Sequence, residues 1–412
     1  MIDIQFLRDN PDKVKAGIAA KNYDPVIVDE VLKLDEQKRE LIQKVQELRT
    51  ERNKAAEERN IERGKVVKEE LQKLEPELKS VEEKFDGQLN RIPNLPFDNV
   101  PIGKGEEENV EIRKWGDPTS LKLRGAWDHL QLATELDLID FEAGAKVAGS
   151  QFYYLKNEAV LLEMALLQFG LELLSQKGFT LMMTPDLAKS RYYLGTGYLP
   201  KGDEAQIYEI DGQDLGLIAT AEVTMAGYHA DEVLREKDLP KKYAAVSHSF
   251  RQEGGSYGKY SKGLYRVHQF TKLEMFAYTT PDQSEKMHQE LLQIEEEILQ
   301  ALKIPYRVLE MCTGDLGAIA AKKYDLEAWM PGRNGYGEVT STSNTTDYQA
   351  RNLDIKYRAG DHNEFVHMLN GTAIAISRTL IAIIENYQQE DGSVLIPEVL
   401  QKWVGKERIE KN

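Results

Sequence analysis

The chain reads Ser249-Phe250-Arg251-Gln252-Glu253-Gly254-Gly255-Ser256 and continues, after residues 257–263, as Leu264-Tyr265-Arg266-Val267-His268-Gln269-Phe270-Thr271-Lys272-Leu273-Glu274-Met275. Two runs of this kind on either side of a glycine-rich loop predict two β-strands. Side chains alternate along a strand, so one face of the second run would carry Arg266, His268, Phe270, Lys272 and Glu274. The other face would carry Val267, Leu273 and Met275 and would pack against a core. We expect Arg251 and Glu253 to share a face of the first run.

The charged face of these two strands has the side chains that nucleotide recognition requires. Guanidinium groups bind phosphate oxygens, an aromatic ring stacks on a base, and a carboxylate accepts from an exocyclic amino group. The pattern therefore favours a nucleotide pocket. Taken alone, a charged strand face is also typical of a salt-bridged surface, and the residues leave both interpretations open.

Residues 26–92 form a separate block with few aromatic residues or glycines. Apolar side chains recur at seven-residue steps in two runs, Leu34, Leu41, Leu48 and Leu71, Leu78, Phe85. This repeat is the seam of a coiled coil, so we expect an antiparallel helical hairpin over about residues 27–92, with a polar turn near Asn60 and Gly64. Pro76 should kink the second helix or interrupt one of its hydrogen bonds.

The outer part of this arm differs in charge from the rest of the chain. Residues 44–68 contain eight basic and five acidic side chains, a net charge of +3. A basic tip indicates an anionic partner such as nucleic acid. The alternative is an ordinary solvated coiled-coil surface of mixed charge, which this segment by itself also fits.

A domain boundary is expected at Pro93 and Pro96, because two prolines this close together stop a helix and stiffen a connector. We therefore divide the chain into residues 1–100 and residues 101–412. In the second part, amphipathic patterns predict helices over 159–177 and 282–302. The strand-like runs are grouped rather than alternating with helices, which favours an α+β body over a doubly wound sheet.

The composition excludes several classes of protein. The 412 residues carry 53 basic and 69 acidic side chains, a formal net charge of −16, and 41% of them are hydrophobic, as in a folded globular protein. No apolar run is long enough to predict a membrane span or a secretion signal. A single cysteine, Cys312, forms no internal disulfide and no multi-thiolate zinc site. A reducing cytoplasm fits best, and neither zinc nor a membrane partner is expected.

Five separated motifs together resemble those of the class II aminoacyl-tRNA synthetases, in the version of the seryl-tRNA synthetases. Phe250-Arg251-Gln252-Glu253 with Arg266-Val267-His268-Gln269-Phe270 resembles motif 2. Gly178-Phe179-Thr180 with Thr184-Pro185 resembles motif 1, and Asn370-Gly371-Thr372 through Ser377-Arg378 resembles motif 3. Thr220-Ala221-Glu222 is similar to the serine-binding signature, and Glu338 to Asn344 to the family's Glu-x-Ser-Ser-x-Ser-Asn strand. The resemblance covers essentially the whole chain.

The resemblance implies an ATP-dependent enzyme and a role for particular residues. Catalysis would depend on Arg251 at the α-phosphate and the amino-acid carboxylate, Glu253 at the adenine amino group, Glu338, and Arg378. Phe270 and Arg378 would cover the two sides of the adenine. The other residues implied at ATP are Gln252, Arg266, Val267, Val339, Thr340 and Ser341, of which Ser341 would hold Mg²⁺ together with Glu338. Those implied at serine are Thr220, Ala221, Glu222, Arg251, Glu274, Asn370 and Thr372.

The family also implies a fold and partners. The fold would be a six-stranded antiparallel sheet flanked by helices, in a homodimer, with the helical arm gripping the long variable stem of the serine tRNA. L-Serine, ATP and tRNA(Ser) would be substrates, with tRNA(Sec) as a further candidate. Three departures from the family pattern are Lys259 and Lys262, which stand where arginines are frequent in the motif 2 loop, and Gly337, which stands where an arginine is usual.

Two other functions remain as alternatives. One is a synthetase-derived protein that binds RNA without charging it, and the other is a ligase that loads an amino acid onto a carrier protein. The presence of Arg251, Glu253, Glu338 and Arg378 disfavours a pure binding protein, which needs no phosphate clamps. The extended basic hairpin disfavours a carrier-protein ligase.

Overall fold

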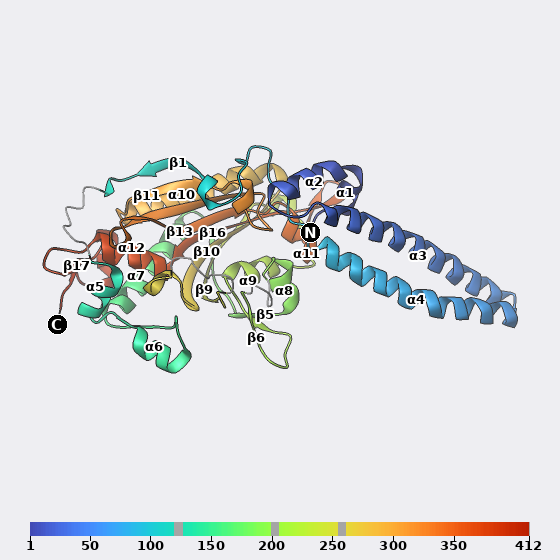
Figure 1. Ribbon diagram of the computed structural model, residues 1–412, viewed down its shortest axis with the longest axis horizontal. Helices are drawn as coiled ribbons and strands as arrows, with labels where there is room; N and C mark the ends of the chain where they lie inside the picture. Colours follow the sequence, from blue (N-terminus) through green and yellow to red (C-terminus); the bar gives the residue numbers. More distant parts are fainter. Residues whose placement is uncertain (119–126, 199–205, 254–260, 412) are drawn as a thin grey trace. The chain divides into compact units, whose positions relative to one another are not determined.

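The computed structural model describes residues 1–118, 127–198, 206–253 and 261–411. The chain divides into two compact units, residues 1–96 and 97–412. Figure 1 shows long helices in the first unit and a mixed body of helices and strands in the second. The α+β class expected from the sequence is confirmed.

The first unit is helical. Its helices are α1 (Ile4–Asp9), α2 (Pro11–Ala20), α3 (Val26–Glu57) and α4 (Ile61–Leu89). Helices α3 and α4 lie antiparallel along their length (Figure 1), as the seven-residue repeat predicts. At the base, Val28, Val31 and Phe85 join Leu7 and Ile18 in one apolar cluster, which fixes α1 and α2 to the start of the hairpin.

The outer half of the arm has a small seam of its own, in which Val45, Val67 and Leu71 are buried. The turn is tight: Arg59 has a φ of +54°, and the Asn60 side chain accepts from the Arg63 N–H to cap α4. Gly64 lies inside α4 and not in the turn. Helix α4 runs through Pro76, so only the hydrogen bond that a proline cannot donate is lost.

The second unit is built on one large sheet. Its strands, in spatial order, are β1 (Val110–Trp115), β11 (Tyr306–Glu310), β12 (Lys322–Met330), β13 (Gly335–Asn344), β16 (His367–Ala375), β10 (Gln269–Thr279), β9 (Lys241–Phe250) and β4 (Thr180–Met183). All neighbours pair antiparallel except β4, which runs parallel to β9. In the described residues the sheet thus has eight strands, two more than the family resemblance implies.

Helices and smaller sheets surround this large sheet. The helices are α5 (His129–Glu135), α6 (Phe141–Ala148), α7 (Glu158–Gln176), α8 (Ser190–Gly195), α9 (Ala221–Gly227), α10 (Ser284–Ala301), α11 (Tyr348–Leu353), α12 (Ile376–Asn386) and α13 (Glu398–Val404). The minor strands are β2 (Ile139–Asp140), β3 (Tyr154–Leu155), β5 (Leu187–Ala188), β6 (Tyr208–Glu209), β7 (Gly216–Leu217), β8 (Val233–Arg235), β14 (Lys356–Ala359), β15 (His362–Phe365), β17 (Val394–Leu395) and β18 (Arg408–Ile409). Helices α7 and α10 agree with the predicted spans 159–177 and 282–302.

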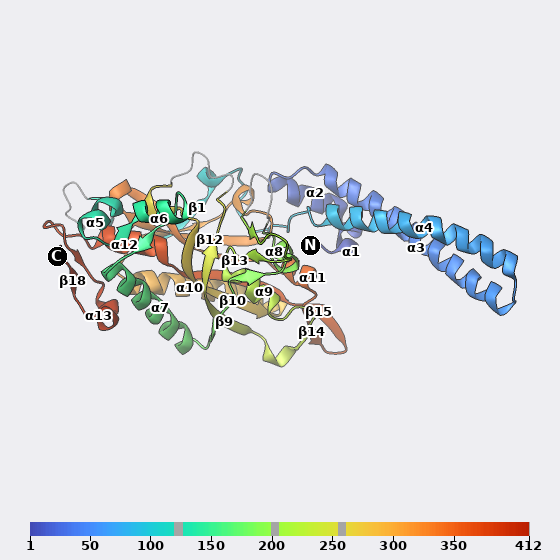
Figure 2. The ribbon, with the colours of Figure 1, turned by 90° about the horizontal axis from the view of Figure 1, so that it is seen from below.

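The two faces of the large sheet have different environments. On one face, Leu273 and Met275 of β10 join side chains of α7, α10 and α12 in the main core, and Figure 2 shows α7 and α10 beside the strands. Gly371 of β16 also faces this side, because a Cβ there would lie 3.0 Å from Glu295 of α10. The next residues along each strand, Glu274 and Thr372, therefore point to the opposite face.

Candidate active site

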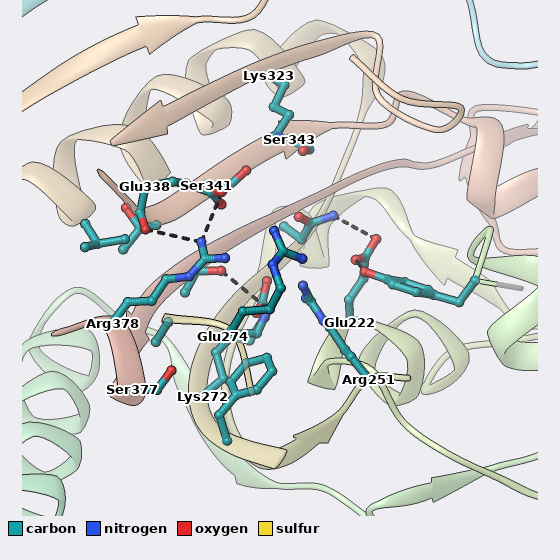
Figure 3. Close-up of a pocket in the computed structure, with 18 of the residues that line it drawn as sticks. Glu222, Arg251, Lys272, Glu274, Lys323, Glu338, Ser341, Ser343, Ser377 and Arg378 are labelled. Carbon is teal, nitrogen blue, oxygen red and sulfur yellow. Dashed lines mark hydrogen bonds and ion pairs between the residues drawn. The ribbon is translucent and has the colours of Figure 1, made fainter. Parts of the chain in front are cut away.

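A cavity of about 280 Å³ lies on the face of the large sheet opposite α10 (Figure 3). Fourteen of the residues that the sequence predicted for the site line it: Glu222, Arg251, Glu253, Arg266, Val267, Phe270, Glu274, Glu338, Val339, Thr340, Ser341, Asn370, Thr372 and Arg378. They come from segments up to 156 positions apart, Glu222 to Arg378. Folding therefore brings the separated motifs to one place.

Three predicted site residues are not in the cavity lining. Thr220 is buried beside it and contacts Glu274, and Ala221 is buried behind it in the first turn of α9. The Gln252 amide points away, because its Nε2 donates to the carbonyl of Ile207 at 2.6 Å. The predicted glycine-rich segment Gly254 to Ser256, with Lys259, lies outside the described residues.

The predicted strand faces of the opening motif are wrong at the strand ends. Strand β9 stops at Phe250, so Arg251 and Glu253 follow it in a loop, where Glu253 adopts a φ of +54°. Strand β10 begins at Gln269, so Arg266 and His268 precede it. His268 stays out of the cavity lining, and its Nδ1 lies 2.8 Å from the carbonyl oxygen of Arg251, which joins the two loop ends.

Two β-bulges place side chains in the cavity that a regular strand would turn away. In β13, Glu338 pairs with Glu327 and Thr340 with Leu326, so Val339 is an extra residue. Glu338 and Ser341, three positions apart, then both line the cavity. In β16 the extra residue is Ala373, because Glu274 pairs with Thr372 and Leu273 with Ile374. Thr372 and Ala375 both line the cavity as a result.

One end of the cavity carries two arginines and an ionised carboxylate. Arg378, in the first turn of α12, holds Glu338 with a 3.0 Å ion pair between Nη1 and Oε2. Burial by itself would raise the pKa of Glu338, but the charges of Arg378 and Lys323 outweigh burial and lower that pKa to about 2. The Arg251 guanidinium lies 5.3 Å from the centre of the Phe270 ring. Figure 3 shows Arg251 and Arg378 entering the cavity from two sides.

Glu253 and Arg266 form a second pair at this end. They make a close ion pair with side chains that are 10% and 19% exposed. Val267, next to Arg266, is buried and contributes an apolar wall. The group therefore combines a carboxylate, a guanidinium and an apolar surface around the Phe270 ring, which is the set that a purine base requires.

The other end of the cavity is small and rich in buried carboxylates. Glu274 makes an ion pair with Lys272 and accepts from Thr220 Oγ1 at 3.1 Å. Lys272 Nζ also donates to Thr372 Oγ1 at 3.4 Å. Burial raises the pKa of Glu222, which accepts from the side chains of Tyr198, Gln349 and Asn370 at 2.8, 2.7 and 2.9 Å. This end therefore presents oriented acceptors among buried side chains.

The sequence predicts no role at the site for Tyr198 or Gln349 and places Lys272 only on the charged strand face. Lys272 and Tyr198 nevertheless line the cavity, and Gln349 holds Glu222. The strand pattern does point to Lys272, because residues two positions apart on a strand share a face and Lys272 therefore lies beside Glu274. Tyr198 and Gln349 reach Glu222 from 24 residues before it and 127 after it. No local pattern could have assigned them.

The structure shows the neighbours of Lys262 and Gly337, two of the residues that depart from the family pattern. Lys262 makes a 2.5 Å ion pair with Asp128 at the start of α5. A Cβ at Gly337 would lie 3.0 Å from the Arg333 guanidinium, so a neighbouring arginine fills the space beside this glycine.

Two further features concern metals and membranes. In the described parts of the chain, no three His, Cys, Asp or Glu side chains are grouped as a metal site requires. Among the helices described, none is both long and apolar enough to cross a membrane.

Comparison with known proteins places this fold and cavity in a class. Residues 207–387 match the sequence model of the tRNA synthetase class II core domain (G, H, P, S and T), so the second unit is the core of a class II aminoacyl-tRNA synthetase. Residues 1–96 match that of the seryl-tRNA synthetase N-terminal domain.

Full-length relatives narrow the class to one family. The serine–tRNA ligase of Dictyoglomus turgidum is 52% identical over 99% of each chain. The crystal structure of seryl-tRNA synthetase from Pyrococcus horikoshii complexed with ATP is 41% identical, with a TM-score of 0.92 and complete coverage of both chains. That of the cytoplasmic serine–tRNA ligase from Naegleria fowleri in complex with AMP is 35% identical, with a TM-score of 0.87, covering 100% of this chain and 99% of that one. The chain belongs to the seryl-tRNA synthetase family.

Proposed function

We propose that this protein activates L-serine with ATP and transfers the serine to the 3′ end of tRNA(Ser). The observation that carries the proposal is the cavity itself. One end has two arginines, an ionised carboxylate and an aromatic ring, as a nucleotide requires, and the other has buried acceptors in a small space. Family membership over the full length supports the same activity.

At the nucleotide end, we assign the contacts by charge and shape. Arg251 would bind the α-phosphate together with the serine carboxylate, because its guanidinium can bridge two anions. Phe270 and Arg378 would enclose the adenine, and Glu253 would accept from its amino group once Arg266 shifts toward phosphate. Val267 and Val339 would supply apolar contacts, with Thr340 beside them. For Gln252, the site assignment is retained only through its backbone, since its amide is bound to Ile207.

Magnesium fits the cavity at Glu338 and Ser341. The β-bulge turns both oxygen-bearing side chains into the cavity, and the Glu338 side chain is 38% exposed, so it can share a hard cation with phosphate oxygens. When bound there, Mg²⁺ would neutralise charge on the phosphates. Glu338 is ionised at neutral pH and is therefore available as a ligand.

At the amino-acid end, Glu274 would accept a hydrogen bond from the serine hydroxyl. The family assignment of Thr220, Ala221, Glu222, Asn370 and Thr372 to serine fits their positions, since Glu222, Asn370 and Thr372 line the cavity and Thr220 orients Glu274. Alanine would leave Glu274 short of a partner and so bind weakly. Threonine carries an extra methyl group, and we expect the side chains that line this end, among them Lys272 and Thr372, to exclude it.

The chemistry needs alignment and charge neutralisation more than proton transfer. A serine carboxylate oxygen attacks the α-phosphorus of ATP, the bond from that phosphorus to the bridging oxygen breaks, and pyrophosphate leaves with the electron pair. Arg251 stabilises the charge on the α-phosphate and Arg378 that on the leaving group. In the second step a ribose hydroxyl at the 3′ end of the tRNA attacks the carbonyl carbon of seryl-adenylate, and the bond from that carbon to the phosphate oxygen breaks. AMP leaves with the electron pair, and its phosphate would take up the hydroxyl proton.

The helical arm would bind the tRNA. Residues 44–68 carry a net charge of +3, in which Glu51, the partner of Arg63, is already counted; Arg49 also pairs with Glu75, which lies outside this segment. Binding through this tip suits a long RNA stem, which proteins recognise through phosphates and shape. Because tRNA(Sec) would be recognised through the same contacts, we propose it as a second substrate.

We also propose a homodimer in the cytoplasm. Strand β4 is at the edge of the large sheet, and its Leu181 and Met183 are 44% and 85% exposed. Val160, Leu161 and Met164 of the contacting helix α7 are exposed as well. An apolar surface on an open sheet edge is typical of a subunit interface. The single free cysteine is compatible with a reducing compartment.

The experiment that tests the function is ATP–pyrophosphate exchange with each of the twenty amino acids in turn. We expect exchange with serine and background levels with alanine and threonine. Exchange without any tRNA charging would favour the ligase that loads a carrier protein. Absence of exchange with every amino acid, together with tRNA binding, would favour an RNA-binding protein and contradict the proposal.

A further inference from the structure

Outside the cavity, a fully buried histidine and glutamate join four separate segments of the second unit. His129 begins α5 and Glu385 lies near the end of α12, and their side chains are 1% and 2% exposed. The third and fourth partners come from the short helical turns η4 (Gly263–Tyr265) and η7 (Pro331–Arg333). None of the chemistry proposed above uses this pair.

Glu385 accepts three hydrogen bonds. Oε1 lies 2.9 Å from the His129 backbone nitrogen and 2.9 Å from its Nδ1, and Oε2 lies 2.8 Å from the Gly332 nitrogen. A buried carboxylate with three donors of this kind is well satisfied. It ties the start of α5 and the turn η7 to helix α12.

The His129 imidazole also binds the backbone of η4. The Leu264 N–H donates to His129 Nε2 at 3.3 Å, so Nε2 must be the unprotonated nitrogen. The proton then sits on Nδ1 and is donated to Glu385, which assigns a neutral imidazole with one donor and one acceptor in use. Both ring nitrogens of His129 are therefore engaged.

Two glycines allow the segments to approach the pair this closely. A Cβ at Gly263 would lie 2.2 Å from His129 Nε2, and its φ is +57°. A Cβ at Gly332 would lie 2.6 Å from the Cα of Asp128 and 2.8 Å from Glu385 Oε1. The backbones of η4 and η7 are thus packed directly on the pair.

Of the two segments held in this way, η4 contacts Arg378 directly and η7 contacts the Tyr265 ring of η4. Tyr265, the residue after Leu264, accepts from Arg378 Nε through its carbonyl at 3.4 Å, and its ring centre lies 4.8 Å from the Arg378 guanidinium. Arg333, the residue after Gly332, lies over the same ring at 5.7 Å. Arg378 and Glu385 are seven residues apart, about two turns along one side of α12. The pair thus fixes the ring on which Arg378 rests.

We infer that His129 and Glu385 are positioning residues for ATP, which act through Tyr265 to hold the Arg378 guanidinium toward the cavity. The inference rests on the proposed function, in which Arg378 contacts ATP and serine binds at the opposite end. It follows that loss of the pair weakens ATP binding and leaves serine binding intact. A purely structural pair would alter stability without this difference between the two substrates.

The test measures ATP binding by calorimetry and both KM values in serine-dependent exchange, with the full-length protein. His129→Phe keeps the ring volume and removes both nitrogens. We expect its ATP affinity to fall at least tenfold and its KM for ATP to rise in parallel, while KM for serine stays within twofold. His129→Gln restores an acceptor for the Leu264 N–H and is expected to recover most of the ATP affinity.

Asn386→Ala is the matched control, because Asn386 is the next residue on α12, is buried, and donates to the carbonyl of Trp329 at 2.8 Å. It should lower the melting temperature and leave ATP affinity within twofold of the wild type. ATP affinity within twofold of the wild type in a folded His129→Phe protein overturns the inference, as does an equal loss in Asn386→Ala.

Should His129→Phe fail to fold, Glu385→Gln takes its place, with the same expected loss of ATP affinity and unchanged KM for serine. If neither variant folds, the pair is a determinant of folding and the inference is overturned. The calorimetric titration needs no amino acid. A wild type that binds ATP but gives no exchange with serine would therefore reject the proposed function without affecting the outcome for the pair.

Discussion

Glu274 is the residue on which amino-acid selection depends. It is 1% exposed, it makes an ion pair with Lys272, and Thr220 donates to its Oε2. Lys272 balances the charge of this carboxylate next to a second buried acid, Glu222, so Glu274 can act as an acceptor for a hydroxyl group. Lys272 is thus the residue that makes two neighbouring acids compatible in one small space.

Replacing Glu274 by Gln should raise the KM for serine about 10- to 100-fold, because a hydrogen bond to a charged group contributes about 1.5–3 kcal/mol. The volume is unchanged, so the KM for ATP should stay within about twofold. Pyrophosphate exchange at varied serine and varied ATP measures both. Glu253→Gln, at the other end of the cavity, is the matched control. It should raise the KM for ATP and leave the KM for serine nearly unchanged. An unchanged serine requirement in Glu274→Gln would refute the assignment.

Helix α10 supports the site from behind the sheet through another buried acid. Glu295 is fully buried, accepts from Thr340 Oγ1 at 3.2 Å, and has an Oε1 with no hydrogen-bond partner among the described residues. Burial raises its pKa well above the ordinary value. A carboxyl group with a raised folded pKa takes up a proton on folding at any pH between its unfolded and folded pKa values, so it costs stability increasingly as the pH rises.

Replacing Glu295 by Gln should therefore flatten the loss of stability with rising pH. Relative to the wild type, the variant should gain about 1.4 kcal/mol for each pH unit above the unfolded pKa of about 4.5, up to the folded pKa. Urea unfolding between pH 5.5 and 8 measures this slope. Glu297→Gln changes an exposed residue of the same helix, whose partner is Lys177, and should show no such slope. Parallel curves for Glu295→Gln and the wild type would show that Glu295 is ionised.

The whole molecule has two surfaces whose function lies outside the cavity, and the first is the open edge at β4. Met183→Glu places a charge in the proposed dimer interface, where it would lose its hydration. Light scattering after size-exclusion chromatography should then give the mass of one chain, 46.9 kDa, in place of twice that mass. Ile102→Glu, at an equally exposed apolar residue, should leave the dimer intact. A wild type that is already a monomer would contradict the dimer.

The second surface is the tip of the helical arm. Replacing Lys54, Arg59 and Lys65 by Glu should raise the KM for tRNA more than tenfold at 150 mM salt and leave serine-dependent exchange within about twofold, because tRNA binding and activation use different units. The salt dependence of tRNA binding should become shallower, because the variant makes fewer phosphate contacts and so releases fewer counterions when it binds. Lys79→Glu, outside the basic segment, is the control. Equal loss of both activities would make the arm a structural element.

Local periodicity is enough to predict the helical arm and two helices of the second unit. The seven-residue repeat is sufficient to predict the hairpin of α3 and α4, and the amphipathic patterns predict α7 and α10, because these signals come from neighbouring side chains on one helix. The resemblance of the separated motifs to a known family also predicted most of the cavity lining, including Arg251, Glu338 and Arg378.

The register of the strands and the partners of the buried polar groups depend on how the whole chain folds. The bulges at Val339 and Ala373 depend on pairing with neighbouring strands. They bring Glu338 to the same cavity as Ser341, and Ala375 to the same cavity as Thr372, although simple alternation would not. Tyr198 and Gln349 at Glu222, and His129 at Glu385, are joined across long sequence separations. Such contacts are selected by packing of the whole chain, so no local pattern encodes them.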